Sequence, residues 1–375
     1  MEKRKLASVQ VIETLSPIQG ADRIEVATMR GLGWECVVKK GDFKIGDTVV
    51  YIEIDSKVPP RPEFEFLRER KFKVKTIKLR KQISQGLIVP MTVLPDPSVP
   101  VGIYSEGDDV TEVLGVTNYA KDMENEDAVV QSPVLKWLMR FRTFRFIYHK
   151  LNTNTGGNWP VEFAGPKTDE TRIQVVAKHL MEHYNDEWYI TEKLDGSSST
   201  FFTYMARKWG RMQKCFGVCS RNVWLKKKNE GSFWKMADKY DLSRKLLIVD
   251  NNISLQGEVV GPSIQKNKYG LPEVDLYIFN IRVAGILLPL EQSLQICDKM
   301  GVKLVPVVKD SFIPVHDIGE KDTVQQVVQA MVEMSKGKSK LANRNREGIV
   351  VRLKSNPEIS FKVINPDFLL EEKDE

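Results

Sequence analysis

Short stretches in which apolar and polar residues alternate fill the first 91 residues, and they restrict the possible fold more than any other feature of the chain. Alternation of this kind, bounded by glycine and aspartate, is typical of half-buried β-strands. Gly-Asp pairs at 41–42 and 46–47 mark turns between two of the stretches. We expect five strands, at residues 7–12, 23–27, 34–38, 49–54 and 72–79. Five short strands joined by tight turns predict a small β-barrel.

An OB-like barrel fits this count best, because the OB-fold is a five-stranded barrel that presents a strand face and loops to oligonucleotides. The segment 68–81, which contains the fifth strand, would carry Lys71, Lys73 and Lys75 on one face, in alternation with mostly apolar residues. This basic stripe suits contact with nucleic-acid phosphates, and the net charge of +6 agrees with a polyanionic partner. The same lysines would also protect a solvated edge strand from aggregation, so both interpretations stay open.

A loop-rich segment at residues 94–119, with several prolines and glycines, marks the first domain boundary. We expect residues 1–115 to form the OB-like nucleic-acid-binding domain. Residues 116–160 are expected to form a linker or insert with a basic amphipathic helix near 134–151, which contains Arg140, Arg142 and Arg145. That helix could contact RNA or a membrane surface, or it could pack between domains.

Residues 161–375 are expected to form the last domain, and they mix strand-like stretches such as 188–191 and 348–351 with helical ones such as 323–335. Strands and helices do not follow a βαβ rhythm there. The predicted fold class is therefore α+β: an N-terminal OB-like β-barrel followed by a domain of antiparallel sheets and helices.

Nothing in the sequence indicates a membrane or a secreted protein. No stretch reaches the roughly 18 apolar residues that span a bilayer, and the basic N-terminus lacks the apolar core of a secretory signal. The four cysteines, Cys36, Cys215, Cys219 and Cys297, lack the paired spacing of a zinc site. We expect a soluble intracellular protein, cytoplasmic or nuclear, with reduced and mostly buried thiols.

Lys193 is the first candidate for chemistry. It follows a predicted strand and precedes the polar turn Asp195-Gly196-Ser197-Ser198-Ser199, which could hold the lysine at the mouth of a pocket. Gly196 would let the backbone approach a nucleotide closely. Taken alone, Lys-x-Asp-Gly is more often a surface turn, so the remaining motifs decide its meaning.

Five segments follow this run in order: CSRN at 219–222, LQGEVVG at 255–261, LYIFN at 276–280, REGIVV at 346–351 and SFKVIN at 360–365. With the Lys193 run, they resemble motifs I, Ia, III, IIIa, IV and V of the covalent nucleotidyltransferases. That superfamily contains the ATP- and NAD-dependent ligases and the mRNA capping enzymes. The last domain is therefore expected to be an adenylyltransferase (ligase) domain.

The position of the barrel in the chain indicates which family of this superfamily the sequence resembles. DNA ligases and capping enzymes carry an OB domain after motif V, whereas only ten residues follow Asn365 here. With the barrel before Lys193 and the segment PKTDETRIQ at 166–174, the chain resembles RNA ligases that have an N-terminal OB domain.

The resemblance implies a three-step reaction that joins a 3′-OH to a 5′-phosphate, as in RNA repair. Lys193 attacks the α-phosphorus of ATP, AMP passes to the RNA 5′-phosphate, and the 3′-OH displaces AMP. Because a free lysine has a pKa of about 10.4, the pKa of Lys193 would have to be lowered for attack at neutral pH. ATP and Mg²⁺ or Mn²⁺ are the implied cofactors. The implied partners are RNA ends or a nicked duplex. The protein is expected to act as a monomer and not to bind a membrane.

The resemblance also assigns roles to individual residues. Asp195, Glu258 and Glu347 would surround a divalent cation, directly or through its waters, although each alone could be a surface ion pair. Lys362 would stabilise charge on the α-phosphate. The nucleotide would be bound by Glu192 at the adenine edge through backbone atoms, by Lys193 and Gly196, by Arg221 at the ribose or phosphate, by Phe279 stacked on adenine, and by Arg172 at the triphosphate.

One position departs from the pattern. Motif V is Lys-x-Lys in much of the superfamily, and Ile364 stands at its second lysine, so that Lys354 or Lys266 would have to supply the charge. A capping-type guanylyltransferase, a DNA ligase and a non-catalytic RNA-binding protein with a degenerate transferase fold stay as alternatives.

Overall fold

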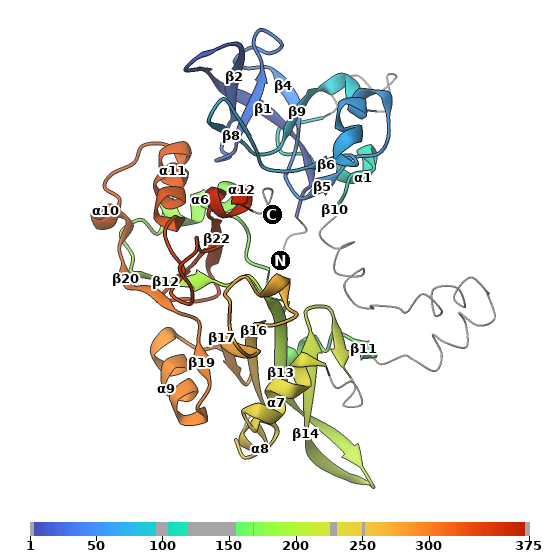
Figure 1. Cartoon of the computed structure of the whole chain (residues 1–375), viewed down its shortest axis with the longest axis vertical. Helices are drawn as coiled ribbons and strands as arrows, with labels where there is room; N and C mark the ends of the chain where they lie inside the picture. Colours follow the sequence, from blue (N-terminus) through green and yellow to red (C-terminus); the bar gives the residue numbers. More distant parts are fainter. Residues whose placement is uncertain are drawn as a thin grey trace, which may run out of the picture. The chain divides into compact units, whose positions relative to one another are not determined.

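The structure is a computed structural model that describes residues 4–94, 104–118, 155–167, 169–225, 231–249 and 252–371. The chain forms two compact units (Figure 1): Met1–Leu135 with Asp322–Gln329 and Leu369–Glu375, and Lys136–Lys321 with Ala330–Phe368. The expected helix near 134–151, with Arg140, Arg142 and Arg145, lies outside the described residues. The domain boundaries expected from the sequence therefore stay a prediction.

The first unit contains a curved antiparallel sheet with the order β3-β2-β1-β4-β9. Its strands are β1 (Ala7–Ile18), β2 (Ala21–Met29), β3 (Glu35–Lys39), β4 (Thr48–Ile52) and β9 (Leu87–Pro90). β1 pairs with β4 before an irregularity between Ile12 and Thr14, and with β2 from Ile12 onward. Bulges bend and twist a strand, and this one lets a single strand serve both halves of the sheet. Buried side chains cover both faces of β4: Val49 and Tyr51 on one, Val50 and Ile52 on the other.

Four of the five predicted strands are present, but the fifth is wrong. Residues 62–84 instead form the 3-10 helix η1 (Pro62–Arg70) and the short strands β6 (Lys73–Val74), β7 (Ile77–Leu79) and β8 (Gln82–Ser84). Lys71 and Phe72 both have positive φ, so the alternation fails there and Lys71 does not share a strand face with Lys73 and Lys75. β9 takes the fifth place. η2 (Met91–Val93), α1 (Thr111–Leu114) and the small sheet of β5 (Ser56–Lys57), β6 and β10 (Thr117–Asn118) complete the unit.

The second unit is built on two sheets. The larger has the order β11-β15-β14-β13-β16-β17-β18, with β19 parallel to β17. Its strands are β11 (Thr155–Asn158), β13 (Ser197–Lys208), β14 (Arg211–Ser220), β15 (Val223–Leu225), β16 (Ile253–Val260), β17 (Asp275–Val283), β18 (Ile286–Leu287) and β19 (Lys303–Leu304). Trp234 of α7 (Ser232–Lys239), Leu242 of α8 (Leu242–Leu247) and Cys297 of α9 (Leu290–Met300) pack in one buried core with Phe201 and Leu255 of this sheet.

The smaller sheet has the order β20-β12-β21-β22 and carries motifs I, IV and V at its strands or strand ends. Its strands are β12 (Trp188–Lys193), β20 (Val307–Phe312), β21 (Gly348–Leu353) and β22 (Ser360–Ile364). Besides α7, α8 and α9, the described helices after residue 160 are α5 (Val161–Ala164), α6 (Ile173–Glu182), η4 (Gln265–Asn267), α10 (Pro314–Asp317), α11 (Val324–Ser335) and α12 (Pro366–Glu371). All residues of β21 are buried, so its neighbours on both sides are fixed in register.

The predicted α+β class, an N-terminal OB-like β-barrel followed by a domain of antiparallel sheets and helices, is confirmed. The expected strands at 188–191 and 348–351 and the helix at 323–335 are present as β12, β21 and α11. The four cysteines are free and buried, as expected. Within the described ranges, no helix is both long and apolar enough to cross a membrane.

Candidate active site

Lys193 is the last residue of β12, and Ser197, four residues later, begins β13. The motif I run therefore lies where the chain crosses from the smaller sheet to the larger one. Gly196 is required at this crossing, because a β-carbon there would lie 2.5 Å from the carbonyl oxygen of Val259 and 3.0 Å from Cγ of Glu258. The glycine thus lets β13 begin directly against β16, where Glu258 stands.

Glu347 holds the Lys193 side chain. The Lys193 ammonium donates to both carboxylate oxygens of Glu347, at Nζ···O distances of 2.7 and 2.8 Å. The pair forms because Lys193 lies opposite Gly348 in the β12–β21 ladder, which puts Glu347 one residue before the pairing position. The Asn365 backbone N–H donates to the Glu347 carbonyl at 2.9 Å and fixes this end of β21. The structure thus brings together residues from motifs I, IV and V.

The buried charges around Lys193 are predominantly acidic. Burial lowers the pKa of Lys193, but the carboxylates of Glu347, Glu258 and Asp195 outweigh this effect and raise that pKa to about 12. Burial, reinforced by Glu347 and Asp195 and opposed by Lys193, raises the pKa of Glu258 to about 8. Without a bound cation, the nearby negative charge thus stabilises the ammonium form, and the lowering of the Lys193 pKa by nearby cations or a metal stays a prediction.

Asp195 contacts two residues that the sequence analysis missed. Its carboxylate forms an ion pair with the buried Lys268, and its backbone N–H donates to the Tyr269 hydroxyl at 2.7 Å. The Lys268 ammonium also lies 4.8 Å from the centre of the Phe368 ring. Lys268 and Tyr269 follow η4 in a loop without periodicity, so their sequence carried no signal of this role.

The three predicted metal ligands, Asp195, Glu258 and Glu347, are near one another without forming a ready metal cage. In the part of the chain that the structure describes, no group of three or more His, Cys, Asp or Glu side chains could hold a metal ion directly. Asp195 and Glu347 are turned toward lysines instead. Their carboxylate oxygens are ligands of the kind that could hold a hydrated cation through its water molecules.

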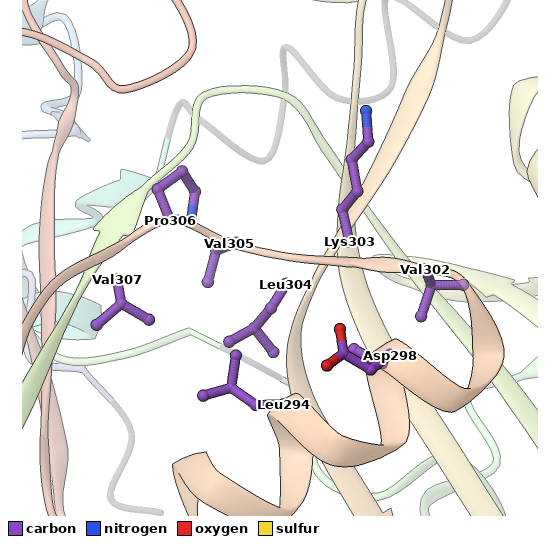
Figure 2. Close-up of a pocket in the computed structure, with 9 residues that line it drawn as sticks. Leu294, Asp298, Val302, Lys303, Leu304, Val305, Pro306 and Val307 are labelled. Atoms are coloured by element: carbon purple, nitrogen blue, oxygen red, sulfur yellow. The ribbon is translucent and has the colours of Figure 1, made fainter.

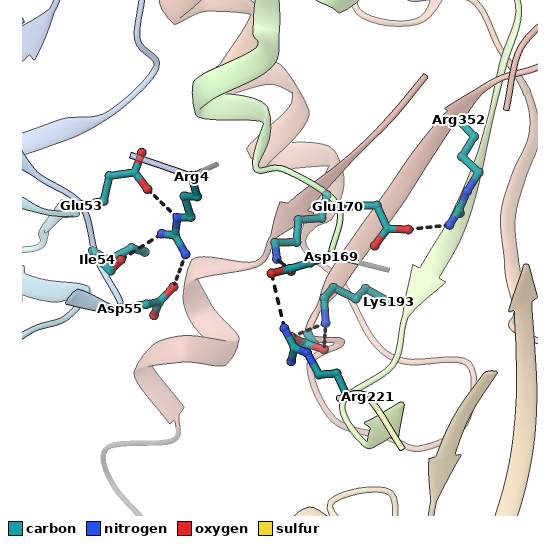
Figure 3. Close-up of polar contacts among 11 residues, drawn as sticks. Arg4, Glu53, Ile54, Asp55, Asp169, Glu170, Lys193, Arg221 and Arg352 are labelled. Atoms are coloured by element: carbon teal, nitrogen blue, oxygen red, sulfur yellow. Dashed lines mark hydrogen bonds and ion pairs between the residues drawn. The ribbon is translucent and has the colours of Figure 1, made fainter. Parts of the chain in front are cut away.

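A second cluster combines cations from two motifs around one acidic side chain. The Asp169 carboxylate accepts from Lys362 Nζ at 2.8 Å. It also lies 3.4 Å from an Arg221 guanidinium nitrogen (Figure 3). The Lys362 backbone N–H donates to the Thr171 carbonyl at 2.8 Å, which brings Arg172 beside Lys362. Burial lowers the pKa of Lys362, although Asp169 opposes this shift. Asp169, which the sequence analysis did not assign, thus joins two side chains expected to bind phosphate.

Glu192 is a buried carboxylate with one oxygen available. Its side chain is 1% exposed, and one carboxylate oxygen accepts from the Lys340 backbone N–H at 2.9 Å. The other oxygen, Oε1, is buried and has no hydrogen-bond partner among the described residues. Its backbone N–H already donates to Pro306. A buried acceptor without a donor costs about 1–3 kcal/mol, so the side chain is a group that could receive a ligand, and contact through backbone atoms stays a prediction.

Phe279 stands on β17. It packs against a buried apolar cluster that contains Leu194, Val260, Tyr269, Tyr277 and Val305. Phe279 itself is half-buried. An aromatic ring with one covered and one accessible side is suited to stacking against a planar base.

Lys354 and Lys266 were the two candidates to supply the positive charge that Ile364 lacks. Lys354 follows β21 at the end opposite Gly348, where its ammonium binds Glu187 at 2.8 Å. Six residues of extended strand place it roughly 20 Å from Lys193, so Lys354 is excluded. Lys266 is exposed in η4, and its neighbour Lys268 is the cation at the site. Ile364 is buried opposite Gly348.

A hollow of about 390 Å³ lies elsewhere in the second unit, between α9 and the β19–β20 segment (Figure 2). Leu294, Leu304, Val305 and Val307 contribute apolar side chains to it, and Lys303 at its edge is paired with Asp275. Since none of the motif residues lines this hollow, it does not belong to the candidate active site.

Gly348 supplies a test of the β21–β22 geometry. A β-carbon there would lie 2.2 Å from the Val363 carbonyl oxygen, so Gly348→Ala must push the two strands apart and separate Glu347 from Lys362. We expect a loss of about 1–3 kcal/mol in unfolding free energy, as for other overpacked sites, measured by thermal unfolding. Gly231→Ala is the control, because nothing lies within 4 Å of its added β-carbon. Equal melting temperatures for the two variants would contradict the close contact.

The chain is similar to known proteins in both sequence and structure. One family model, described as an OB-fold domain, matches residues 6–91, and another, described as RNA ligase, matches residues 186–364. The structure is similar to an apo mutant of Naegleria gruberi RNA ligase, with 30% identity, 100% of both chains covered and a TM-score of 0.75. A mutant of that ligase with ATP and Mn is 29% identical over 99% of this chain and 100% of its own, with a TM-score of 0.77. The same ligase with PPi gives 30% identity, 100% coverage of both chains and a TM-score of 0.76. Curated proteins give no match.

Proposed function

Because the chain belongs to the RNA ligase family, we propose that it is an ATP-dependent RNA ligase that joins a 3′-OH and a 5′-phosphate through AMP bound covalently to Lys193. The observation that carries this proposal is the Lys193–Glu347 pair, with Asp195 and Glu258 beside it and the Lys362–Arg221 cluster in the same unit. The solved complexes of the Naegleria ligase with ATP or AMP and Mn support the choice of nucleotide and metal.

In the first step, the Lys193 nitrogen bonds to the α-phosphorus as the bond to the pyrophosphate oxygen breaks. The nitrogen must first lose a proton, and Glu347 is the nearest acceptor, since its oxygens lie within 2.8 Å and burial raises its pKa. A hydrated Mg²⁺ or Mn²⁺ held by Asp195, Glu258 and Glu347 would supply the positive charge that favours neutral Lys193.

Phosphate groups would bind at the second cluster. Lys362 and Arg221 there already hold an anionic oxygen pair, that of Asp169. A phosphate offers the same kind of acceptor with more charge, so it can take over these contacts. Arg172, beside Lys362, would orient the leaving pyrophosphate. Fixed cations at these points stabilise the charge that develops on the transferring phosphoryl group.

The base would lie between Glu192 and Phe279. Adenine presents an amino group where guanine presents a carbonyl oxygen, and the available Glu192 oxygen is an acceptor that only the amino group satisfies. This difference favours ATP over GTP. It also separates the proposal from a capping-type guanylyltransferase.

The three parts of the chain would have different functions. Residues 1–115 would bind RNA as an OB domain, residues 116–160 would link, and residues 161–375 would carry the adenylate chemistry in a monomeric, intracellular repair enzyme. The OB-fold match over residues 6–91 and the RNA ligase match over residues 186–364 support this order. Free, buried cysteines fit a reducing compartment.

The decisive experiment is incubation of the protein with each α-labelled nucleoside triphosphate and Mg²⁺ or Mn²⁺, followed by denaturing gel. We expect label on the protein from ATP alone, and its release by added pyrophosphate, which reverses the first step. Label from GTP would instead support a guanylyltransferase. Absence of label with every nucleotide and both metals, from protein that still binds RNA, would support a non-catalytic RNA-binding protein. Joining of nicked DNA in preference to RNA would indicate a DNA ligase.

A further inference from the structure

The hairpin of β13 and β14 extends beyond the sheet that contains it (Figure 1). The two strands pair from Ser199–Ser220 to Lys208–Arg211, whereas β16 pairs with β13 only as far as Phe202. β15 pairs with β14 only at Val218 and Cys219. The outer part of the hairpin is thus a two-stranded ribbon. Such ribbons are seldom stabilised by themselves, so its projection calls for an explanation.

The end of this ribbon exposes an aromatic residue among cations. Trp209 is 96% exposed, Met212 is 60% exposed, and Arg207 and Arg211 on either side of the turn are exposed as well. We call these four residues the hairpin tip. The sequence contains no Asp or Glu between Asp195 and Glu230, so the whole hairpin is free of acidic side chains.

Local structure does not explain the tryptophan. Trp209 and Gly210 form the turn with φ of 53° and 79°, a conformation for which hairpins prefer Asn-Gly or Asp-Gly. The left-handed region costs a residue with a side chain about 1–2 kcal/mol, and the exposed ring regains almost no burial. A large aromatic side chain at this position therefore lowers stability without a compensating contact inside the protein.

We propose that the hairpin tip is an RNA-binding site for unpaired nucleotides at a distance from the ends being joined. Exposed aromatic rings stack on unpaired bases, and arginines beside them neutralise phosphates without reading sequence. The absence of acidic residues favours a polyanion over a protein surface of mixed charge. The proposal rests on the proposed function for the identity of the polyanion.

The same hairpin begins and ends at the candidate active site. β13 starts just after Asp195 and Gly196, and β14 ends just before Arg221. About 11 residues of extended strand separate this base from the tip, or roughly 35 Å. RNA held at the tip would therefore add affinity only when it is long enough to reach Lys193 as well.

The test uses the full chain with Trp209→Ala and with Arg207→Ala/Arg211→Ala. Two measurements are made: binding of a 5′-phosphorylated single-stranded RNA of roughly 20 nucleotides, and KM for joining this RNA or one of roughly 5 nucleotides. We expect Trp209→Ala to weaken binding and raise KM for the long RNA by about 5- to 150-fold, the range for loss of one stacked base. KM for the short RNA and labelling by ATP should stay unchanged. The double arginine variant should reduce the salt slope of binding by about one unit per lost phosphate contact.

Trp209→Phe should retain most of the affinity, because it keeps an aromatic face. Ile286→Ala is the matched control, since Ile286 is 70% exposed beside another tight turn of the same unit, the one that joins β17 to β18. Wild-type binding of the long RNA by Trp209→Ala would overturn the proposal, as would an equal loss in Ile286→Ala. If Trp209→Ala lost binding to phosphatidylserine vesicles while it kept wild-type RNA binding, the proposal would also be overturned. If the wild type takes up no AMP yet Trp209→Ala loses RNA binding, the proposed function fails and the hairpin-tip site stands.

Discussion

Replacing Lys193 with alanine is expected to abolish formation of the covalent protein–AMP adduct, by a factor of about 10⁴ or more, as for removal of other covalent nucleophiles. The variant should still join RNA that already carries AMP on its 5′-phosphate, because the last step does not use the lysine nitrogen as nucleophile. Lys193 is held by Glu347 at the end of β12, and no described lysine shares those contacts. The measurement is labelling with α-labelled ATP, followed by denaturing gel.

Lys354→Ala is the control for this substitution. It removes another lysine ammonium that binds a glutamate at 2.8 Å, at the opposite end of the same strand ladder. Its adduct should form at the wild-type rate. Full labelling of Lys193→Ala would show that another residue is the nucleophile. Failure of Lys193→Ala to join pre-adenylated RNA, in a protein with a normal melting curve, would contradict the limited role given to Lys193.

Glu258→Ala and Glu347→Ala are each expected to reduce RNA joining by about 10²- to 10³-fold, which is typical for loss of one preorganised electrostatic group. Each should also shift the concentration of Mg²⁺ or Mn²⁺ that gives half-maximal activity upward, because each removes part of the negative charge around the cation. Glu347→Ala should have the larger effect on adduct formation, since it also releases the Lys193 ammonium. Metal titrations of both adenylation and joining measure these effects.

Glu333→Ala is the matched control, because Glu333 forms an exposed ion pair with Lys336 on α11. Exposed pairs of this kind contribute little to stability, so both metal dependence and rate should stay at wild-type values. Near-normal joining in Glu258→Ala and Glu347→Ala together would mean that these carboxylates serve the fold rather than the reaction.

The sequence predicts the part of the site that depends on strand register. Lys193 and Glu347 each stand at the end of a strongly apolar strand, and such strands pair in only one register when buried. The resemblance of motifs I and IV to those of the covalent nucleotidyltransferases predicted their proximity, and the β12–β21 register agrees with it. The sequence pattern did not predict three residues of the site, because they lie in loops and contact the site only through tertiary packing: Asp169, Lys268 and Tyr269.

The missed fifth strand has a comparable cause. Lys71 and Phe72 adopt left-handed backbone angles, which residues with bulky side chains rarely do. Alternation of apolar and polar residues continues through them in the sequence, so the pattern alone predicts a strand. The surrounding packing, in which Val58 pairs with Phe72 through their backbones, overrides that local preference.

The contacts that build the site also connect residues far apart along the chain. The Lys193–Glu347 pair spans 154 positions, and the Lys362–Asp169 pair spans 193. Contacts of such separation carry a large loop-closure entropy and form slowly, after local helices and hairpins. During refolding, the ability to take up AMP should therefore lag behind the recovery of helical signal. Under the proposed function, the number of AMP groups bound per chain would then measure the fraction of molecules that have completed β21 and β22, and would count correctly folded protein in any preparation.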